Sequence, residues 1–394
     1  MSNPHSDLSI RIWNNYSKGQ LHADLTGRFN SLVFSTALHG GFKECRVDVP
    51  MKLSEAWLYL NRENLPGRHF YHMEISEENR TVWEGRLSDI EVRGNSSFVG
   101  VSLTAFGYWS SCRDQYYDAD DSGNTDWKIS GPHNVGKIIR EIITKECPSI
   151  NGTVDIDLTS RDVVGIDLTA RDYPMDIIID KLAPLSDSDA SIWYFAVWDN
   201  RKPYWKKRDG TSLYWYTHMS EIREFHLLQE AKHLRNYILP VVGTTEGTGS
   251  SDAESQKDYP VREAKISLPT GIASTAANDA RDLALSERKF PRQDESFILS
   301  GHVYTPLVSY TTASQAKGAM NERPKWWVRA GQTIRIQDFL PASISVPKLD
   351  DLRTFHILET EYNALTDELT IQPDRPANRL DILLTRLGQL ERDR

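Results

Sequence analysis

The feature that most constrains the fold is a series of four short, strand-like runs between His69 and Tyr108. Each run is rich in β-branched and aromatic residues, and turn-forming residues such as Ser88 and Asp89 separate one run from the next. Apolar side chains alternate in the last run, which is typical of a strand with one buried face. The series therefore predicts a locally folded antiparallel meander, with strands at Phe70–Ile75, Thr81–Leu87, Ile90–Arg93 and Phe98–Phe106.

One strand of this meander, Thr81–Leu87, allows the two faces of the sheet to be assigned. Successive side chains of a strand point to opposite faces. Trp83 and Leu87 therefore share one face, which we expect to be the core, whereas Glu84 and Arg86 are expected to face outward.

A similar order of elements is found toward both ends of the chain. Before the meander, strands at Leu8–Trp13, Leu32–Thr36 and residues 46–49 lead to a helix that contains Trp57. After residue 217, strands again lead to a helix, with Ser274 as its expected N-cap, and more strands follow. The strands predicted in this second part are Phe225–Leu228, Asn236–Val242, Ala264–Leu268, Phe297–Tyr304, Trp326–Arg329, Thr333–Gln337, Phe355–Tyr362 and Leu369–Ile371.

Between these parts, the pattern is mixed. Pro132 is expected to open a helix, and a second helix is expected at Asp176–Leu182. A hairpin is expected to join Ser191–Trp198 to Pro203–Lys207. The apolar face of the first helix consists of Val135, Ile138, Ile139, Ile142 and Ile143.

These patterns predict the domain organisation. Single cores stop growing at roughly 250–300 residues, so 394 residues predict more than one core. We expect an α+β, β-rich chain in which two β units with one helix each, 1–108 and 218–376, flank a mixed α/β region at 109–217. A C-terminal helix is expected at 377–394, and the polar stretch 243–258 is expected to be a mobile loop.

Composition excludes several classes of function. The net charge of −9 gives no basis for tight nucleic-acid binding, which requires basic patches. Cys45, Cys112 and Cys147 are far apart, so neither a disulfide framework nor a structural zinc is predicted. No apolar run approaches the roughly 20 residues of a membrane helix. The first residues lack the pattern of a secretory signal, so we expect synthesis in the cytoplasm.

No catalytic, cofactor or metal site is predicted. The chain has no nucleophile elbow or phosphate-binding loop, and its histidines are scattered. The stretch Asp118–Asp126 begins like a calcium loop, but Ile129 stands where the bidentate Glu should fall. A solvated acidic turn is therefore favoured there, with calcium binding as the alternative.

The aromatic residues between 193 and 216 allow a second interpretation of the chain. Their side chains could stack on sugars, which would make this a carbohydrate-binding or carbohydrate-active β protein. Packing in a core or an interface is the favoured interpretation. The residues are Trp193, Trp198, Trp205, Tyr214, Trp215 and Tyr216.

Two places are candidates for a subunit interface. If Trp326 and Trp327 lie in a strand, only one indole can face the core, and a partner could bury the other. The C-terminal helix would either dock on its own domain or contact another subunit. Its apolar face consists of Leu380, Leu383, Leu384 and Leu387.

Two local patterns, in this order, resemble those of phage tail hub proteins, the family of baseplate hubs and the related spikes of contractile injection machines. The first is Gly41-Phe42 followed by the Trp57 helix and the strand pair that ends in Val82–Glu91. The second is Arg329–Ile336, followed after a long loop by Thr354–Tyr362 and Leu369–Ile371, and Asn236–Pro240 also fits.

The resemblance implies a fold and a role. In this family, each chain contributes two tube-type β-barrel domains, and a homotrimer forms a pseudo-six-fold ring that joins the tail tube to a three-fold tip. DNA passes through the lumen without specific binding, and three chains would carry −27, three times −9. The implied partners are the tail tube or distal tail protein ring, the tape measure protein and a central spike or fibre. The implied location is the virion, at the tail tip, with no enzymatic activity. Because no fibre or peptidase segment follows Arg394, receptor binding or wall cleavage is expected in other proteins.

Overall fold

In the computed structural model, the described residues are 8–60, 70–94, 99–117, 132–153, 155–159, 162–164, 172–186, 193–207, 215–268, 273–290, 292–306, 320–337 and 354–374. Three predictions fall outside these ranges. They are the acidic stretch Asp118–Asp126, the aromatic residue Tyr214 and the C-terminal helix at 377–394 with its four leucines.

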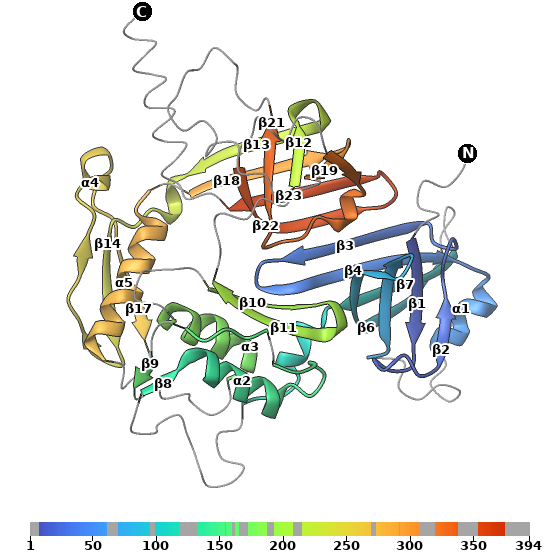
Figure 1. Cartoon of the computed structure of the whole chain (residues 1–394), viewed down its shortest axis with the longest axis horizontal. Coiled ribbons are helices and arrows are strands. Elements are labelled where there is room, and N and C mark those ends of the chain that lie inside the picture. The colour runs from blue at the N-terminus through green and yellow to red at the C-terminus, as the bar shows by residue number, and fades with distance from the viewer. Residues whose placement is uncertain are drawn as a thin grey trace, which may run out of the picture.

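The first β unit is an antiparallel sheet with one helix beside it (blue in Figure 1). Its strand order is β2-β1-β5-β6-β7-β4-β3, so the meander β5-β6-β7 pairs as predicted. The β2 strand was not predicted. The elements are β1 (Leu8–Trp13), β2 (Leu21–Asp24), β3 (Ser31–Ala37), β4 (Gly40–Pro50), α1 (Leu53–Leu60), β5 (His72–Glu77), β6 (Arg80–Gly94) and β7 (Val99–Phe106).

The turn predicted at Ser88 and Asp89 is wrong. The two expected strands on either side form the single strand β6. Its register against β7 shifts between Leu87 and Asp89, so the extra residue is accommodated as a β-bulge. A bulge needs no chain reversal, and β6 therefore continues for 15 residues.

The middle region packs helices against a hairpin (green in Figure 1). The apolar face predicted for α2 is buried, but the helix begins at Val135, because the Asn134 side chain accepts from the Gly136 N–H as the N-cap. Pro132 belongs instead to a short strand. The elements are β8 (Pro132–Asn134), α2 (Val135–Glu146), β9 (Asp162–Val164), α3 (Pro174–Asp176) with its π-helical continuation Ile177–Leu182, β10 (Trp193–Trp198) and β11 (Lys202–Lys207).

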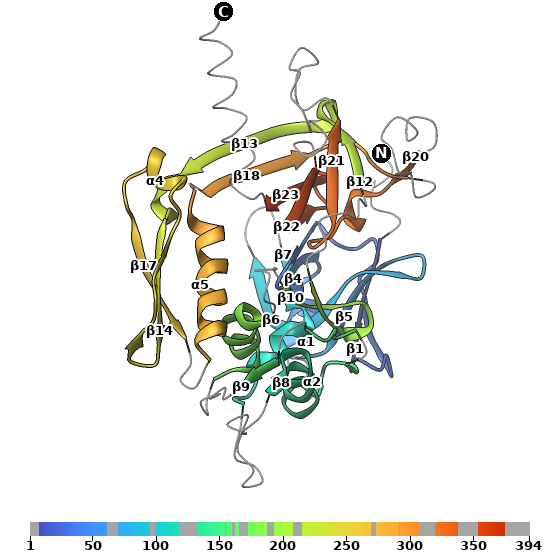
Figure 2. The same ribbon diagram turned by 60° about the vertical axis from the view of Figure 1, so that its left-hand side comes forward.

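A small separate sheet lies beside α5, as Figure 2 shows. The stretch 243–258, expected to be a loop, contains two short strands that pair with β14 and one helical turn. Ser274 is the first residue of α5 rather than its cap, which is Ala273. The elements are β14 (Tyr237–Val242), β15 (Thr245–Glu246), β16 (Ser250–Ser251), α4 (Ser255–Asp258), β17 (Glu263–Leu268) and α5 (Ser274–Arg288).

The second β unit (orange to red in Figure 1, with β12 and β13 in yellow-green) forms around β22. On one side of β22 the order is β23-β18-β13, and on the other it is β21-β12-β19-β20. The sequence did not predict β12 or β20, and it merged β18 with β19. The strands are β12 (Trp215–His218), β13 (Ile222–Glu230), β18 (Arg292–Leu299), β19 (Val303–Pro306), β20 (Met320–Arg323), β21 (Thr333–Gln337), β22 (Thr354–Asn363) and β23 (Glu368–Asp374).

Two large apolar cores hold the chain together. One core extends through both β units, from Phe42 and Trp83 in the first to Phe297 and Phe355 in the second. The other joins α2 and the β10–β11 hairpin to one face of α5, which contributes Ala276 and Ala280. The prediction of a β-rich chain is therefore confirmed, and the described strands form large mixed sheets with few helices.

Candidate functional site

The two β units are joined edge to edge by the strands β3 and β22, which lie side by side in Figure 1. Residues 33–37 of β3 pair antiparallel with residues 359–363 of β22. The Leu38 N–H continues the ladder by donating to the Leu358 carbonyl across 2.7 Å. Lys43 and Glu359 add an ion pair of 3.1 Å beside it. The described strands of both units therefore belong to one continuous sheet.

A buried hydroxyl pair lies in the centre of this joint. Thr36 and Thr360 are 2% and 4% exposed, and their hydroxyl oxygens lie 2.6 Å apart. The Ala330 N–H also donates to the Thr36 hydroxyl, across 2.9 Å. A buried polar group needs a partner, and here each partner comes from the other β unit.

Arg329 connects three parts of the chain at one point. Its guanidinium forms two 3.0 Å contacts with the Asp199 carboxylate in the β10–β11 turn and donates to the Thr81 carbonyl of β6 across 2.7 Å. The same group lies over the Phe42 ring, 4.9 Å from its centroid. A planar, fork-shaped donor suits several acceptors at once. We call this contact set, together with the β3–β22 joint, the junction.

The second β unit also contacts the β5–β6 turn. The indole N–H groups of Trp326 and Trp327 both donate to the Glu77 carboxylate, and the Arg80 guanidinium lies 3.7 Å from the centroid of the Trp327 ring. The strand predicted at Trp326–Arg329 is wrong, because Lys325–Trp327 forms a 3₁₀ turn after Pro324. Both indoles are buried within the chain itself. The prediction that they form a subunit interface stays a prediction.

Glu84 is a buried carboxylate beside the junction, so the prediction that it faces outward is wrong. The turn of the β10–β11 hairpin covers this face of β6, and the Arg201 N–H donates to Glu84 across 2.6 Å. Burial raises the pKa of Glu84 to about 7, against the opposing effect of this hydrogen bond. The Arg201 guanidinium lies 3.8 Å from the Tyr16 ring centroid, which fixes the turn on the first β unit.

A buried histidine lies on the neighbouring strand β5. The His72 Nδ1 lies 2.8 Å from the Tyr108 hydroxyl, and burial lowers the pKa of His72 to about 3. Burial also raises the pKa of Tyr108 above its ordinary range. His72 is therefore neutral at physiological pH, and its ring serves packing and hydrogen bonding.

The aromatic residues between 193 and 216 do not form one exposed surface among the described residues. Trp193 stacks on Trp205 within the core of the middle region, with ring centroids 5.5 Å apart. Trp215 belongs to the core of the β units, and Trp198 packs edge-on against Phe42. The favoured interpretation, core packing, accounts for these residues.

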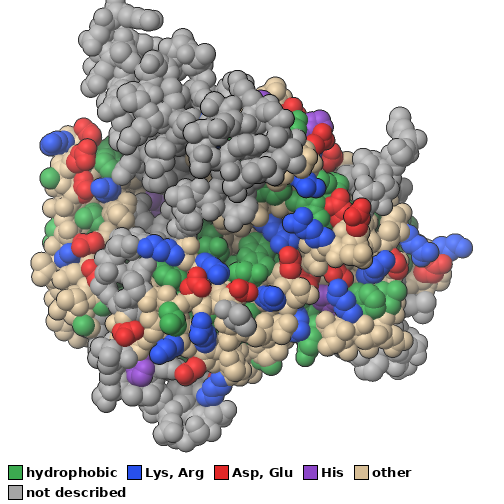
Figure 3. Space-filling model, viewed as in Figure 1, with side chains coloured by type: hydrophobic (Ala, Val, Ile, Leu, Met, Phe, Trp, Pro, Cys, Tyr) green, Lys and Arg blue, Asp and Glu red, His purple; other side chains and the backbone are tan. Residues whose placement is uncertain are grey.

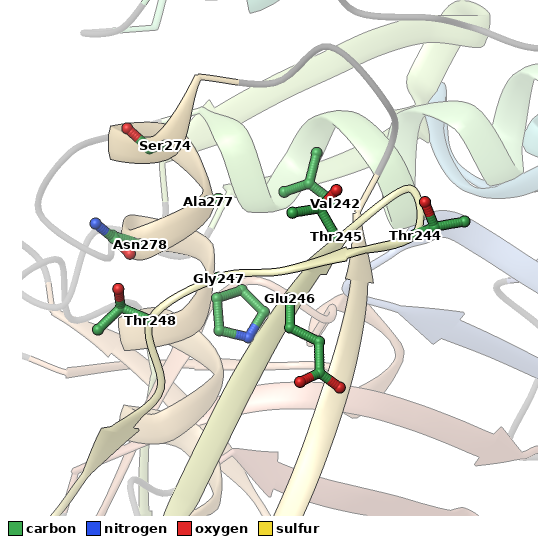
Figure 4. Close-up of a pocket in the computed structure, with 10 residues that line it drawn as sticks. Val242, Thr244, Thr245, Glu246, Gly247, Thr248, Ser274, Ala277 and Asn278 are labelled. Atoms are coloured by element: carbon green, nitrogen blue, oxygen red, sulfur yellow. The ribbon is translucent and has the colours of Figure 1, made fainter.

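In the part of the chain that is described, the buried Glu84, His72 and Tyr108 are the group of titratable residues that stands out. The described His, Cys, Asp and Glu side chains form no cluster suited to a metal ion. No described helix is long and apolar enough to cross a membrane. A cavity of about 510 Å³ lies between the β14–β15 turn and α5, lined by small and polar residues including Thr245, Thr248, Ser274 and Asn278 (Figure 4).

Surface charge is distributed in small groups. On the face in Figure 3, basic and acidic side chains of the described residues are interspersed rather than gathered in one patch. Such a face offers no broad basic surface for the phosphate backbone of a nucleic acid.

Sequence reasoning missed most of the residues that form the junction. Arg329 belongs to the second hub-like pattern, which gave it no role, Asp199 lies in the expected hairpin connection, and Thr360 lies in an expected strand. Beside the junction, Glu77 and Arg80 face each other across the β5–β6 turn, and their sequence carried no signal of a partner some 250 residues away. Only the adjacent indoles of Trp326 and Trp327 gave a signal, because one of them was expected to be exposed or buried by a partner.

Solved structures resemble the whole chain. No protein-family model matches it, and no curated protein matches it in sequence. The tail protein from Neisseria meningitidis MC58 matches with a TM-score of 0.59 and 10% identity, over 93% of this chain and 96% of that one. The 43 kDa tail protein of prophage MuSo2 from Shewanella oneidensis gives 0.58 and 9%, over 94% and 98%. Prophage tail protein gp18 from Listeria monocytogenes EGD-e gives 0.50 and 11%, over 97% and 99%. The resemblance to phage tail proteins is therefore confirmed at the level of the fold.

Proposed function

We propose that this chain, which has the fold of phage tail proteins, is a structural tail hub protein without enzymatic activity. In this proposal, three copies form a pseudo-six-fold ring that joins the tail tube to a three-fold tip, and DNA passes through its lumen. The location is the virion, at the tail tip.

The observation that carries the proposal is the joint between β3 and β22. A ring of six similar positions built from three chains needs two β units per chain that meet side by side. The two units here share one sheet and one apolar core. The hydrogen bond from Arg329 to the Thr81 carbonyl and the buried Thr36–Thr360 pair both connect the two units and support a fixed relative orientation.

The two-barrel arrangement and the domain boundaries belong to the same proposal. The barrel-type units span 1–108 and 218–376, with 109–217 between them. The sheet of β14–β17 and α5, although placed by sequence in the second unit, shares apolar contacts with the middle region. We assign the middle region, and the β14–β17 sheet with α5, to the outside of the ring, where they support the β units.

The electrostatic balance favours passage of DNA rather than binding. The net charge is −9, and the visible face carries interspersed charges. A neutral or negative lumen has no cations to replace the counterions of DNA, so DNA slides without adhering. The partners proposed are the tail tube or distal tail protein ring, the tape measure protein and a central spike or fibre.

The proposal is tested by the mass and shape of the isolated full chain. Light scattering coupled to size-exclusion chromatography should give three times the 45.0 kDa of one chain, about 135 kDa. Negative-stain images of that fraction should show a ring with a central opening. A chain that stays monomeric over a wide range of concentration, and is absent from purified tails of the phage or prophage that encodes it, would sink the proposal.

A further inference from the structure

Two cysteine thiols lie close together in the middle region, outside the junction. Cys112 lies in the 3₁₀ helix Tyr108–Arg113, which follows the last strand of the first β unit. Cys147 follows the last turn of α2, where its N–H donates to the Ile143 carbonyl across 3.0 Å. The two sulfur atoms lie 3.2 Å apart, although the residues are 35 positions apart in the sequence.

The surrounding structure holds the two segments together independently of the sulfurs. The Gln115 side chain donates to the Glu146 carbonyl across 2.8 Å, and the Lys145 ammonium lies 5.9 Å from the Tyr117 ring centroid. Both thiols are buried. The approach of the sulfurs is therefore a consequence of packing between the 3₁₀ helix and the end of α2.

The third cysteine is separated from this pair. Cys45 is buried in the core that the two β units share, whereas Cys112 and Cys147 belong to the core of the middle region. Pairing with Cys45 would require one core to open into the other. The geometry selects a single pair from three possible ones.

We propose that Cys112 and Cys147 are a redox-sensitive pair, which a hydroperoxide converts into an intramolecular disulfide. A disulfide has an S–S bond of roughly 2.0 Å, so closure requires the sulfurs to approach by about 1.2 Å. Small adjustments of the short 3₁₀ helix and of the two side-chain rotamers can supply this movement.

The reaction balances with hydrogen peroxide as the oxidant. One thiolate attacks a peroxide oxygen, the O–O bond breaks, and a sulfenic acid and water result after protonation. The second thiolate then attacks the sulfenic sulfur, the S–S bond forms, and the hydroxyl leaves as water. Two thiols and one peroxide thus give one disulfide and two waters, with two electrons passing from sulfur to oxygen.

The rate should be slow at neutral pH. The neighbouring Cys147 sulfur and burial raise the pKa of the Cys112 thiol well above its ordinary value. The thiolate is therefore scarce, and oxidation should accelerate as the pH rises. A small peroxide can reach these sulfurs through local opening, whereas a bulky thiol reagent should leave the native pair unmodified.

The test is a count of thiols in the isolated full chain before and after treatment with hydrogen peroxide. After removal of peroxide with catalase, the chain is unfolded in guanidinium with iodoacetamide, digested and analysed by mass spectrometry. Alkylated cysteines should fall from three to one, Cys45. A linked peptide pair containing Cys112 and Cys147 should appear, and dithiothreitol should abolish it.

Single variants provide the controls. Cys45→Ala should still form the linked peptide, whereas Cys112→Ala and Cys147→Ala should not. The melting temperature of the wild-type chain should rise by several degrees on oxidation, because the link restricts the unfolded chain, and that rise should be absent in both pair variants. The inference is overturned if three thiols remain alkylatable after prolonged treatment. It is also overturned if the pair oxidises to sulfinic acids without a link, or if Cys45 takes part in the linked peptide. The test needs only the isolated chain, so its outcome is independent of whether the chain forms a ring.

Discussion

Arg329→Ala is expected to weaken the contacts of the second β unit with both the β10–β11 turn and β6 more than any exposed charge substitution. The guanidinium is 13% exposed, makes two 3.0 Å contacts with Asp199 and donates to the Thr81 carbonyl. Removing one partner of a buried ion pair costs roughly 3–5 kcal/mol. Asp199 is 39% exposed and can regain water, so we discount the loss to about 2–3 kcal/mol of unfolding free energy.

The assay is urea denaturation of Arg329→Ala, Asp199→Ala and the double variant, followed by tryptophan fluorescence. The double-mutant cycle isolates the pair, and its coupling free energy is expected at about 1–2 kcal/mol. The pair Arg11 and Asp24, both about half exposed at a distance of 3.5 Å, is the matched control, with an expected coupling below about 0.5 kcal/mol. Equal coupling free energies in the two cycles would refute the reasoning that burial strengthens the Arg329–Asp199 pair relative to an exposed one.

Three further predictions concern single residues. Glu84 has a folded-state pKa of about 7, above its ordinary value of 4.5. The folded state therefore favours the protonated Glu84 carboxyl. The stability that this preference gives the fold is complete below pH 4.5 and is lost as the pH rises through 7. Relative to Glu84→Gln, the wild-type unfolding free energy should fall by up to about 3 kcal/mol between pH 4.5 and 8, and a pH-independent difference would contradict this. Thr360→Val should lower the unfolding free energy, measured by urea denaturation, by about 1 kcal/mol. Thr36→Val should lower it more, because Thr36 also accepts from the Ala330 N–H. A larger loss for Thr360→Val would contradict the assigned hydrogen bonds. Gly41→Ala should destabilise by more than about 2 kcal/mol, because φ is +83° and the new Cβ would lie 2.3 Å from a carbonyl oxygen of β10. Gly27→Ala, with φ of +68° and nothing within 4 Å of the new Cβ, should cost less unfolding free energy, with both variants measured by urea denaturation; equal losses would contradict the close approach at Gly41.

Local periodicity predicted local structure well. The α2 helix was recognised from its apolar spacing, and its predicted face is buried at every position. The β1 strand was predicted with the bounds that the structure has. In both segments, one regular secondary structure runs from end to end and the apolar residues fall on its buried face, so their spacing contains the information.

Tertiary contacts overrode this pattern at the junction. Glu84 stands at a position that alternation assigns to the outer face, but a hairpin more than 100 residues later covers that face. A strand was predicted at Trp326–Arg329, yet Pro324 starts a turn that lets both indoles reach one carboxylate. Pairing between distant strands leaves no trace in local periodicity, and this is why the candidate site was largely invisible in the sequence.

The β3–β22 joint has a consequence for how the chain is made. Thr36 leaves the ribosome 324 residues before its partner Thr360. At synthesis rates of roughly 5–20 residues per second, the interval is about 16–65 s. During that time, the nascent first unit presents an unpaired strand edge, which is a template for wrong pairing with other chains. Completion of β22 is thus the event that closes this edge.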